Sequence, residues 1–303
     1  MTKKSRFELG LSDADYPEVL LQRQSAPTTL YGVGREDALR PGIAIIGARN
    51  ATPYGLRIAA LIATWAVELG YVVYSGGARG CDQAAHKGAL EAGGSTVVVM
   101  GCGADLVYPT GAKQLFDRIA QNGAVISEHP WKTPPMKHRF VQRNRLIAAL
   151  SDLVVVTEAR LPSGTLSTVH HALDLGVPIA AVPGSILCLE SAAPNRLISE
   201  GAFPLCCRDD LQLACNLIGS RADVGTLYRD FTQADSDDVA EESHAGKIFA
   251  ACCSMPSLPD ELAEELGLSL AEILEVLGHF EVQGKVIRHT DGRYTGEGSA
   301  VLC

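Results

Sequence analysis

The chain has 303 residues, a hydrophobic fraction of 47% and a charged fraction of 20%. These values are typical of a globular protein with room for a large domain and a small one. No apolar run reaches the roughly 18 to 20 residues of a membrane-spanning helix, and no apolar stretch follows the basic start of the chain. The composition therefore excludes a membrane span, argues against a signal peptide and predicts a cytoplasmic protein.

The net charge of −9 is concentrated in the C-terminal third. Residues 1–219 carry 20 Lys and Arg against 19 Asp and Glu, whereas residues 220–303 carry 6 against 16. The first part is therefore free to hold a local basic patch, and the overall acidity does not exclude an anionic ligand.

Six short runs rich in Val and Ile are apolar at consecutive positions, a pattern typical of strands buried on both faces of a parallel sheet. They are residues 43–47, 71–75, 96–100, 124–127, 153–157 and 178–182. Segments of helical length alternate with them, at 53–69, 82–93, 112–122, 139–150 and 164–175. The alternation predicts an α/β fold with a doubly wound, mostly parallel sheet over residues 1–219. Residues 11–40 are expected to form a helix and a loop at the edge of this sheet.

The character of the sequence changes near residue 220. Residues 230–243 contain six acids and no base, which predicts an acidic linker over 220–243. Residues 246–254, 259–267 and 270–280 then read as three short helices, followed by a hairpin that turns at Asp291-Gly292. Three helices and a hairpin predict a small winged-helix domain over residues 244–303.

Turns rich in small residues follow the first two predicted strands. In an open α/β sheet, ligands bind beyond the carboxyl ends of the strands, where helix N-termini point. Arg49 and Arg79 each place a cation in such a turn, Asp82 is placed to cap the next helix, and the glycines allow close backbone approach. For Arg49, pairing with a local carboxylate is the alternative. The candidate anion-binding residues of the two turns are Arg49, Ser75, Gly76, Arg79, Gly80 and Asp82.

A basic stretch with one aromatic residue, KHRFVQRNR (137–145), follows the fourth predicted strand. Cations that track phosphates and an aromatic ring that stacks on a base are what single-stranded nucleic acid requires. The alternative is a solvated basic helix face with Phe140 in the core. The candidates here are Lys137, Phe140, Arg143, Asn144 and Arg145. After the fifth strand, Ser163, Gly164 and Thr165 begin a helix and form a natural seat for an anion.

An ordered series of motifs runs through residues 13 to about 219. It comprises YP (16–17), IIGARNATPYG (45–55), SGGARGCDQAAHKGALEAGG (75–94), YP (108–109), FVQRNRLIAALS (140–151), SGTLST (163–168), AVPGS (181–185) and NRLISEGA (195–202). With this series the chain resembles the DNA-processing protein A family (DprA, also called Smf), which lies in the LOG-like superfamily.

The resemblance implies an extended Rossmann-like domain that binds single-stranded DNA. It further implies that the protein protects incoming DNA and helps to load the RecA recombinase during natural transformation or recombination. A homodimer, no cofactor and no enzymatic activity are also implied. Arg49, Arg79 and the residues around them resemble the central anion pocket of the family, and the basic stretch with Phe140 resembles its strand-binding rim.

An enzyme or sensor acting on nucleotides is the competing function. Phosphoribohydrolases share the fold and resemble PGGxGTxxE after the fifth strand, with the Glu as acid and base. Here the stretch reads LPSGTLST, with Ser163 in place of a Gly and Thr168 in place of the Glu. Because a hydroxyl cannot replace a carboxylate in proton transfer near neutral pH, no catalytic residue is predicted. Nucleotide binding without turnover in the same pocket remains the alternative.

Metal binding and duplex recognition have little support in the sequence. The nine cysteines include no CxxC pair, and His170 and His171 are adjacent, so on a helix they point about 100° apart. The expected recognition helix of the winged domain carries Glu272 and Glu275 and no Lys or Arg. Repulsion from phosphates disfavours docking this helix on DNA, so we expect the domain to contact protein or to self-associate.

Overall fold

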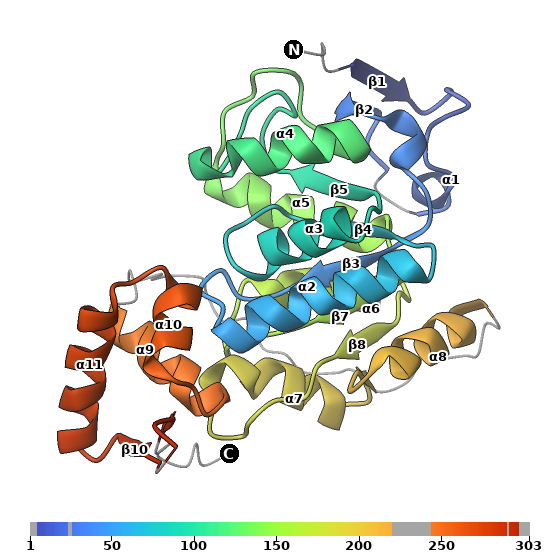
Figure 1. Cartoon of the computed structure of the whole chain (residues 1–303). Coiled ribbons are helices and arrows are strands. Elements are labelled where there is room, and N and C mark those ends of the chain that lie inside the picture. Colours follow the sequence, from blue (N-terminus) through green and yellow to red (C-terminus); the bar gives the residue numbers. More distant parts are fainter. Residues whose placement is uncertain (1–4, 24–25, 220–243, 290, 297–303) are drawn as a thin grey trace.

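The computed structural model describes residues 5–23, 26–219, 244–289 and 291–296. Figure 1 shows a large α/β domain with a smaller helical domain beside it. In the described part of the large domain, one nine-stranded sheet has the order β1-β2-β6-β5-β4-β3-β7-β8-β9. The strands from β6 to β9 in this order are parallel, whereas β1 pairs with β2 and β2 with β6 in antiparallel fashion. The predicted doubly wound, mostly parallel sheet is therefore confirmed.

The six predicted strands form within one or two residues of their expected limits. The strands of the sheet are β1 (Arg6–Gly10), β2 (Thr29–Gly34), β3 (Gly42–Ile46), β4 (Val72–Ser75), β5 (Thr96–Met100), β6 (Ala124–Ser127), β7 (Leu153–Val156), β8 (Ile179–Ala181) and β9 (Phe203–Pro204). The helices of this domain are α1 (Glu18–Leu21), α2 (Pro53–Glu68), α3 (Cys81–Glu91), α4 (Lys113–Asn122), α5 (Lys137–Ala149), α6 (Thr165–Asp174), α7 (Ala192–Ser199) and α8 (Arg208–Gly219). Short 3₁₀ turns lie at Glu36–Ala38, Thr110–Ala112 and Leu189–Ser191.

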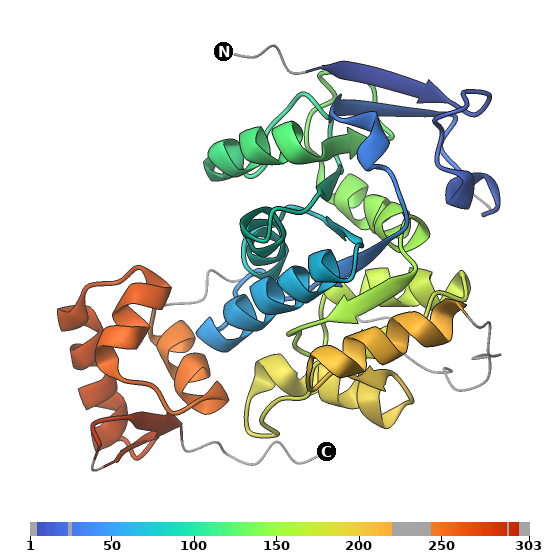
Figure 2. The ribbon, with the colours of Figure 1, turned by 45° about the vertical axis from the view of Figure 1, so that its right-hand side comes forward.

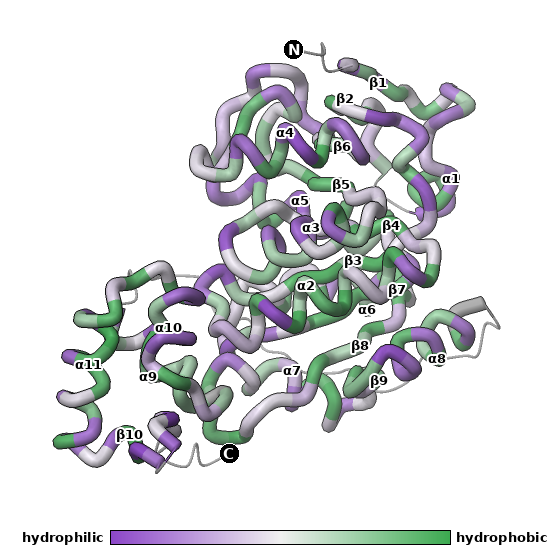
Figure 3. The backbone as a smooth tube through the Cα atoms, in the orientation of Figure 1, coloured by the Kyte–Doolittle hydropathy of each residue, from purple (hydrophilic) through white to green (hydrophobic). Residues whose placement is uncertain are grey.

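The sheet is covered on both faces. Helices α5, α6 and α7 share one apolar cluster with one face, and α2, α3 and α8 share another cluster with the opposite face. Every residue of β3, β5 and β7 is buried, which explains why their sequences are apolar at consecutive positions. Figure 3 shows the hydrophobic colour concentrated in these central strands.

The N-terminal segment departs from the prediction. Residues 11–40 were expected to form a helix and a loop at the edge of the sheet, and α1 lies within them, but β2 does too and, together with β1, extends the sheet beyond β6. The stretch contains Gly32, a weak strand former. The packing of Gly32 against β1 explains why a glycine is found there. A Cβ atom on Gly32 would lie 2.0 Å from Cζ of Phe7, so the missing side chain makes room for the Phe7 ring.

The order of the strands places a topological switch between β3 and β7. From β3 the chain winds through β4 and β5 to β6 on one side, and α5 then carries it back to β7 on the other side of β3. The loops after β3 and β7 therefore lead away to opposite faces of the sheet. Ligands of open α/β sheets bind in the crevice that such a divergence leaves at the carboxyl ends of the strands.

The smaller domain has the three helices and the hairpin predicted for a winged helix. It comprises α9 (His244–Ser254), α10 (Pro259–Leu266), α11 (Leu270–Val282), β10 (Val286–Arg288) and β11 (Tyr294–Gly296). Its helices α9 and α10 contact α2, as Figures 1 and 2 show, and Arg57 Nε lies 2.9 Å from Glu265 Oε1 across this contact. The predicted acidic linker lies outside the described residues.

None of the helices in the described ranges is long and apolar enough to cross a membrane.

Candidate nucleic-acid interface

Two loops meet at the carboxyl ends of β3 and β4. The N–H of Cys81 donates to the carbonyl of Ala48 over 3.1 Å. Gly80 has φ of +83°, and a Cβ atom there would lie 2.2 Å from Ala48 O and 2.6 Å from Arg49 O. Only glycine allows this conformation and this close approach. The loop that carries Arg79 is thereby packed directly on the loop that carries Arg49.

A third loop, which follows β7, joins the first two. The hydroxyl of Thr165 donates to Gly47 O over 3.2 Å, and the N–H of Ala48 donates to Glu158 O over 2.7 Å. Ser163 Oγ accepts from the N–H of Thr165 and shapes the start of α6. We call residues 47–52, 76–80 and 163–165 the turn cluster. It lies where the switch in strand order predicts a ligand site.

Two features of the turn cluster favour an anion. Helices α2, α3 and α6 begin at it, so their N-terminal N–H groups and dipoles favour an anion there. The side chains of Arg49 and Arg79 are exposed, and within the described ranges neither makes a hydrogen bond or an ion pair. The alternative considered for Arg49, pairing with a local carboxylate, is therefore not seen among the described residues. Both guanidinium groups are available to phosphate oxygens.

The remaining residues predicted in the first two turns shape the site. Ser75 is buried, and its hydroxyl donates to Ile45 O over 2.6 Å, which ties β4 to β3. Asp82 does not cap the helix as predicted, because α3 begins at Cys81 and Gly80 is its N-cap. The Asp82 carboxylate instead accepts from the N–H of Ala78 over 3.2 Å within the turn. Burial raises the pKa of this carboxyl, and the neighbouring Arg143 acts in the opposite direction.

Arg143 is not on the rim where it was predicted. It is only 4% exposed, and its guanidinium donates to the carbonyl oxygens of Gly76 (2.7 Å) and Val99. A Cβ atom on Gly76 would lie 2.5 Å from Arg143 Nη1, so this glycine admits the guanidinium. Burial lowers the pKa of Arg143 to about 10, and Asp82 partly offsets this effect. The buried Arg143 side chain therefore stabilises the turn after β4 through its hydrogen bond to Gly76 O.

The other residues of the basic stretch lie on α5, which begins at Lys137. Lys137 is exposed at the N-terminus of the helix. Arg145 is partly exposed and forms an ion pair with Glu128, the residue after β6. Asn144 Nδ2 donates to Ser167 Oγ over 3.4 Å and so links α5 to α6.

Phe140 lies in the first turn of α5 and is partly exposed. Its exposure lies between the two alternatives, a ring open to a base and a ring buried in the core. Its ring centroid lies 5.0 Å from that of Tyr108 at an interplanar angle of 35°. Its main chain packs against Gly101, where a Cβ atom would lie 2.9 Å from Phe140 Cα and N. The Arg143 guanidinium lies over the Phe140 ring, 5.7 Å from its centroid. Arg143 therefore contacts both the Phe140 ring and, through the carbonyl of Gly76, the turn cluster.

Sequence reasoning missed a further buried ionisable group at the site, the carboxyl group of Glu158. Glu158 follows β7 and is completely buried, and its carboxylate accepts from the N–H of Thr52 over 2.9 Å and from the Thr52 hydroxyl. A Cβ atom on Gly55 would lie 2.1 Å from Glu158 Oε2, so the start of α2 closes over the carboxylate. Burial raises the pKa of Glu158 to about 7, against the effect of the hydrogen bonds from Thr52. Its position directly after a predicted strand was the available signal.

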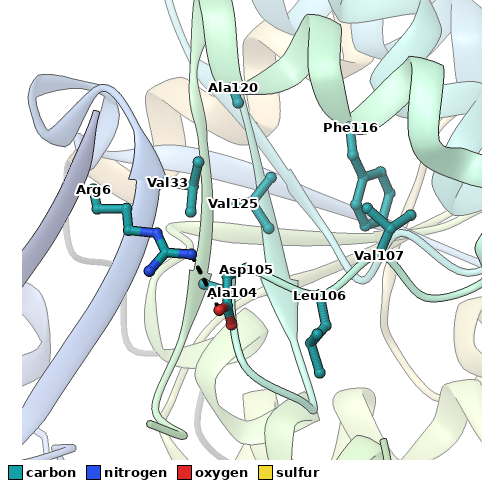
Figure 4. A pocket seen from close by; sticks show the side chains of 9 residues that line it. All are labelled: Arg6, Val33, Ala104, Asp105, Leu106, Val107, Phe116, Ala120 and Val125. Carbon is teal, nitrogen blue, oxygen red and sulfur yellow. Dashed lines mark hydrogen bonds and ion pairs between the residues drawn. The ribbon is translucent and has the colours of Figure 1, made fainter. Parts of the chain in front are cut away.

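A cavity of about 220 Å³ lies elsewhere, between the β1–β2 pair, β6 and α4. Figure 4 shows its largely apolar lining and the ion pair between Arg6 and Asp105 beside it. It contains none of the predicted site residues. Among the described residues, no group of three or more His, Cys, Asp or Glu is arranged to hold a metal ion.

Comparison with known proteins agrees with the resemblance. Residues 8–216 match the model of the DNA recombination-mediator protein A family, and residues 232–292 match that of the DprA winged helix domain. Protein Smf of Escherichia coli K12 is 32% identical over 275 residues, covering 89% of this chain and 72% of its own length.

Two solved structures are also similar to this chain. DNA processing protein A from Streptococcus pneumoniae is 36% identical, with a TM-score of 0.65 over 70% of this chain and 74% of the other. DNA processing protein A from Helicobacter pylori, whose structure describes a single-stranded-DNA binding mode, is 31% identical, with a TM-score of 0.62 over 70% of this chain and 96% of the other. From its motifs, its fold and these matches, the chain belongs to the DNA recombination-mediator protein A family.

Proposed function

We propose that this protein binds single-stranded DNA across the turn cluster and the adjoining start of α5. The observation that carries the proposal is the pair of exposed guanidinium groups of Arg49 and Arg79, which have no partner among the described residues and which Gly80 sets beside the N-termini of three helices. This arrangement suits successive phosphates of a strand. Lys137 and Phe140 at the start of α5, with the Tyr108 ring of the loop after β5 beside Phe140, continue the surface with one cation and two aromatic rings.

The resemblance to the family extends the proposal to a role. We propose that the protein protects incoming single-stranded DNA in the cytoplasm and helps to load RecA on it during natural transformation or recombination. The binding surface of one chain spans only a few nucleotides, and a homodimer would gain affinity by engaging one strand at two sites. The test of loading is the lag before RecA hydrolyses ATP on DNA coated with single-strand-binding protein. This protein should shorten the lag, and an unchanged lag would contradict the loading role.

A role as a nucleotide-processing enzyme has less support. Thr168 holds the position of the catalytic Glu of the phosphoribohydrolases, and it is buried on α6. The nearest carboxylate after β7, that of Glu158, is completely buried and engaged by Thr52. Neither group is placed to exchange a proton with a ligand at the turn cluster. We therefore propose a binding protein without catalysis.

Fluorescence anisotropy separates DNA binding from nucleotide binding. A labelled oligo-dT of about 20 nucleotides is titrated with the full chain, next to a duplex of the same length and to AMP as competitor. We expect the single strand to bind more tightly than the duplex and to stay bound in the presence of millimolar AMP. AMP incubated with the protein should not be hydrolysed. Failure to bind the single strand at low salt, together with tight AMP binding, would overturn the proposal and favour a nucleotide sensor.

A further inference from the structure

We propose that Tyr108 is the residue on which a base of the bound strand stacks, with Phe140 as its support. This inference rests on the proposed binding of single-stranded DNA and assigns a base-binding position within that surface. The ligand it predicts is the flat face of any nucleobase, because stacking on an aromatic ring is tolerant of sequence.

Exposure distinguishes the two rings. Tyr108 is 46% exposed, although it carries a large aromatic side chain, whereas Phe140 is only partly exposed. Phe140 already has the Tyr108 ring 5.0 Å away and the buried Arg143 guanidinium over its ring. Its contacts with the protein therefore use much of the ring surface. The aromatic surface left for a ligand at this point belongs mainly to Tyr108.

The loop that carries Tyr108 is held in place before any ligand binds. The N–H of Gly103 donates to Thr133 O over 2.9 Å, and the N–H of Lys132 donates to Asp105 Oδ1 over 2.8 Å. Asp105 also forms an ion pair with Arg6, as Figure 4 shows. A ring on a fixed loop loses little freedom on binding, which favours affinity.

The surroundings of Tyr108 suit a nucleotide as a whole. Lys137 lies three residues before Phe140 on α5, so the two share one face of the helix and place a cation beside the aromatic pair. Arg143 joins the Phe140 ring to the carbonyl of Gly76 in the turn cluster. A strand whose phosphates lie along Arg79 and Lys137 would bring a base to the exposed Tyr108 ring.

The test is a double-mutant cycle in which the Tyr108 ring is removed by substitution and the base is removed by an abasic site in the oligonucleotide. Wild type, Tyr108→Leu and Tyr108→Phe are titrated with oligo-dT and with an oligonucleotide of the same length that contains abasic sites. Leucine keeps apolar bulk without a π-face, and phenylalanine keeps the π-face without the hydroxyl. Tyr71→Leu is the matched control, because Tyr71 is a partly exposed tyrosine directly before β4, at the amino ends of the strands and so on the side of the sheet away from the turn cluster.

We expect Tyr108→Leu to weaken oligo-dT binding about 5-fold or more, which corresponds to the loss of one stacked base. Tyr108→Phe and Tyr71→Leu should bind as wild type does, and Tyr108→Leu should cost nothing further on the abasic strand. Stacking should also quench the fluorescence of a 2-aminopurine base in the wild-type complex, and Tyr108→Leu should restore it.

The outcomes separate this inference from the proposed function. If wild type binds oligo-dT and Tyr108→Leu binds it equally well, stacking on Tyr108 is wrong and the binding function stands. Equal losses on oligo-dT and on the abasic strand would also overturn the stacking, because the lost contact would not involve a base. If wild type binds no single strand at low salt, the proposed function fails and this inference fails with it.

Discussion

Replacing Glu158 by Gln should remove a pH dependence of folding stability that the wild-type chain carries. Glu158 is completely buried at the carboxyl end of β7, and its ordinary pKa of 4.5 is raised to about 7. Burial penalises the charged form and is the largest cause, and the negative charge of Glu190 acts in the same direction, whereas hydrogen bonds from Thr52 and from the N–H of Gly55 lower the pKa. The folded protein therefore holds the Glu158 proton more tightly than the unfolded chain does.

The difference between the two pKa values of Glu158 sets the direction and the size of the change in the free energy of unfolding with pH. Below pH 4.5 the carboxyl is protonated in both states, and its favourable contribution is fully present. Between pH 4.5 and 7 the unfolded chain releases the proton while the folded chain keeps it, so the free energy of unfolding falls as the pH rises. With 1.36 kcal/mol for each pH unit, the loss reaches about 3 kcal/mol by pH 8.

Urea denaturation of wild type and Glu158→Gln at pH 5, 6, 7 and 8 measures the effect. The free energy of unfolding of wild type, taken relative to that of the variant, should fall by about 2–3 kcal/mol between pH 5 and pH 8, because a small part of the total loss occurs below pH 5. Glu91→Gln, at an exposed position at the end of α3, serves as the control. The difference in the free energy of unfolding between wild type and this variant should not follow the fall expected for Glu158→Gln. A difference between wild type and Glu158→Gln that stays constant with pH would refute the assignment of the raised pKa.

Further substitutions test the construction of the site and the contact between the smaller domain and α2. Gly80→Ala should cost about 3 kcal/mol or more, because φ of +83° is combined with an overlap with main-chain oxygen. Gly93→Ala has similar φ but open space, so about 1–2 kcal/mol is expected, and equal losses in urea denaturation would contradict the packing of the two turns. Arg143→Met should cost about 3–5 kcal/mol, since buried carbonyls lose their donor, and a near-neutral result would mean that the guanidinium is not buried. Glu265→Gln should change stability by less than about 1 kcal/mol, because its partner Arg57 is 61% exposed; a loss of several kcal/mol would show that this pair holds the winged domain in place.

The central sheet could be predicted from the sequence because each of its strands carries its own signal. Strands β3 to β8 are buried on both faces, so they read as apolar at consecutive positions. The β1–β2 pair depends on contacts between distant residues. Gly32 lies in a strand because it pairs with Phe7 of β1 and with Ile126 of β6, and because the Phe7 ring packs over it. No local pattern shows those contacts.

The same limit applies to the site. The motifs located the loops around Arg49 and Arg79, since both follow predicted strands of one sheet. They could not separate Arg143 from the exposed cations of the basic stretch. Helical spacing places Arg143 on the face of α5 that carries the buried Leu146 and Ile147, but the carbonyl groups that accept its hydrogen bonds come from β5 and from the turn after β4. Burying an arginine there depends on those partners, which only the folded chain supplies.

The measurement that tests the proposed binding surface most directly is the salt dependence of oligo-dT affinity for wild type and for Arg49→Ala with Arg79→Ala. Each lost phosphate contact should reduce the slope of log K against log salt concentration by about 0.7, so the double variant should show a slope shallower by about 1.4. The charge-matched control is Arg40→Ala with Arg118→Ala, two exposed arginines outside the turn cluster, and it should keep the wild-type slope. Identical slopes for wild type and the turn-cluster variant would contradict the proposal that Arg49 and Arg79 hold the phosphates of the strand.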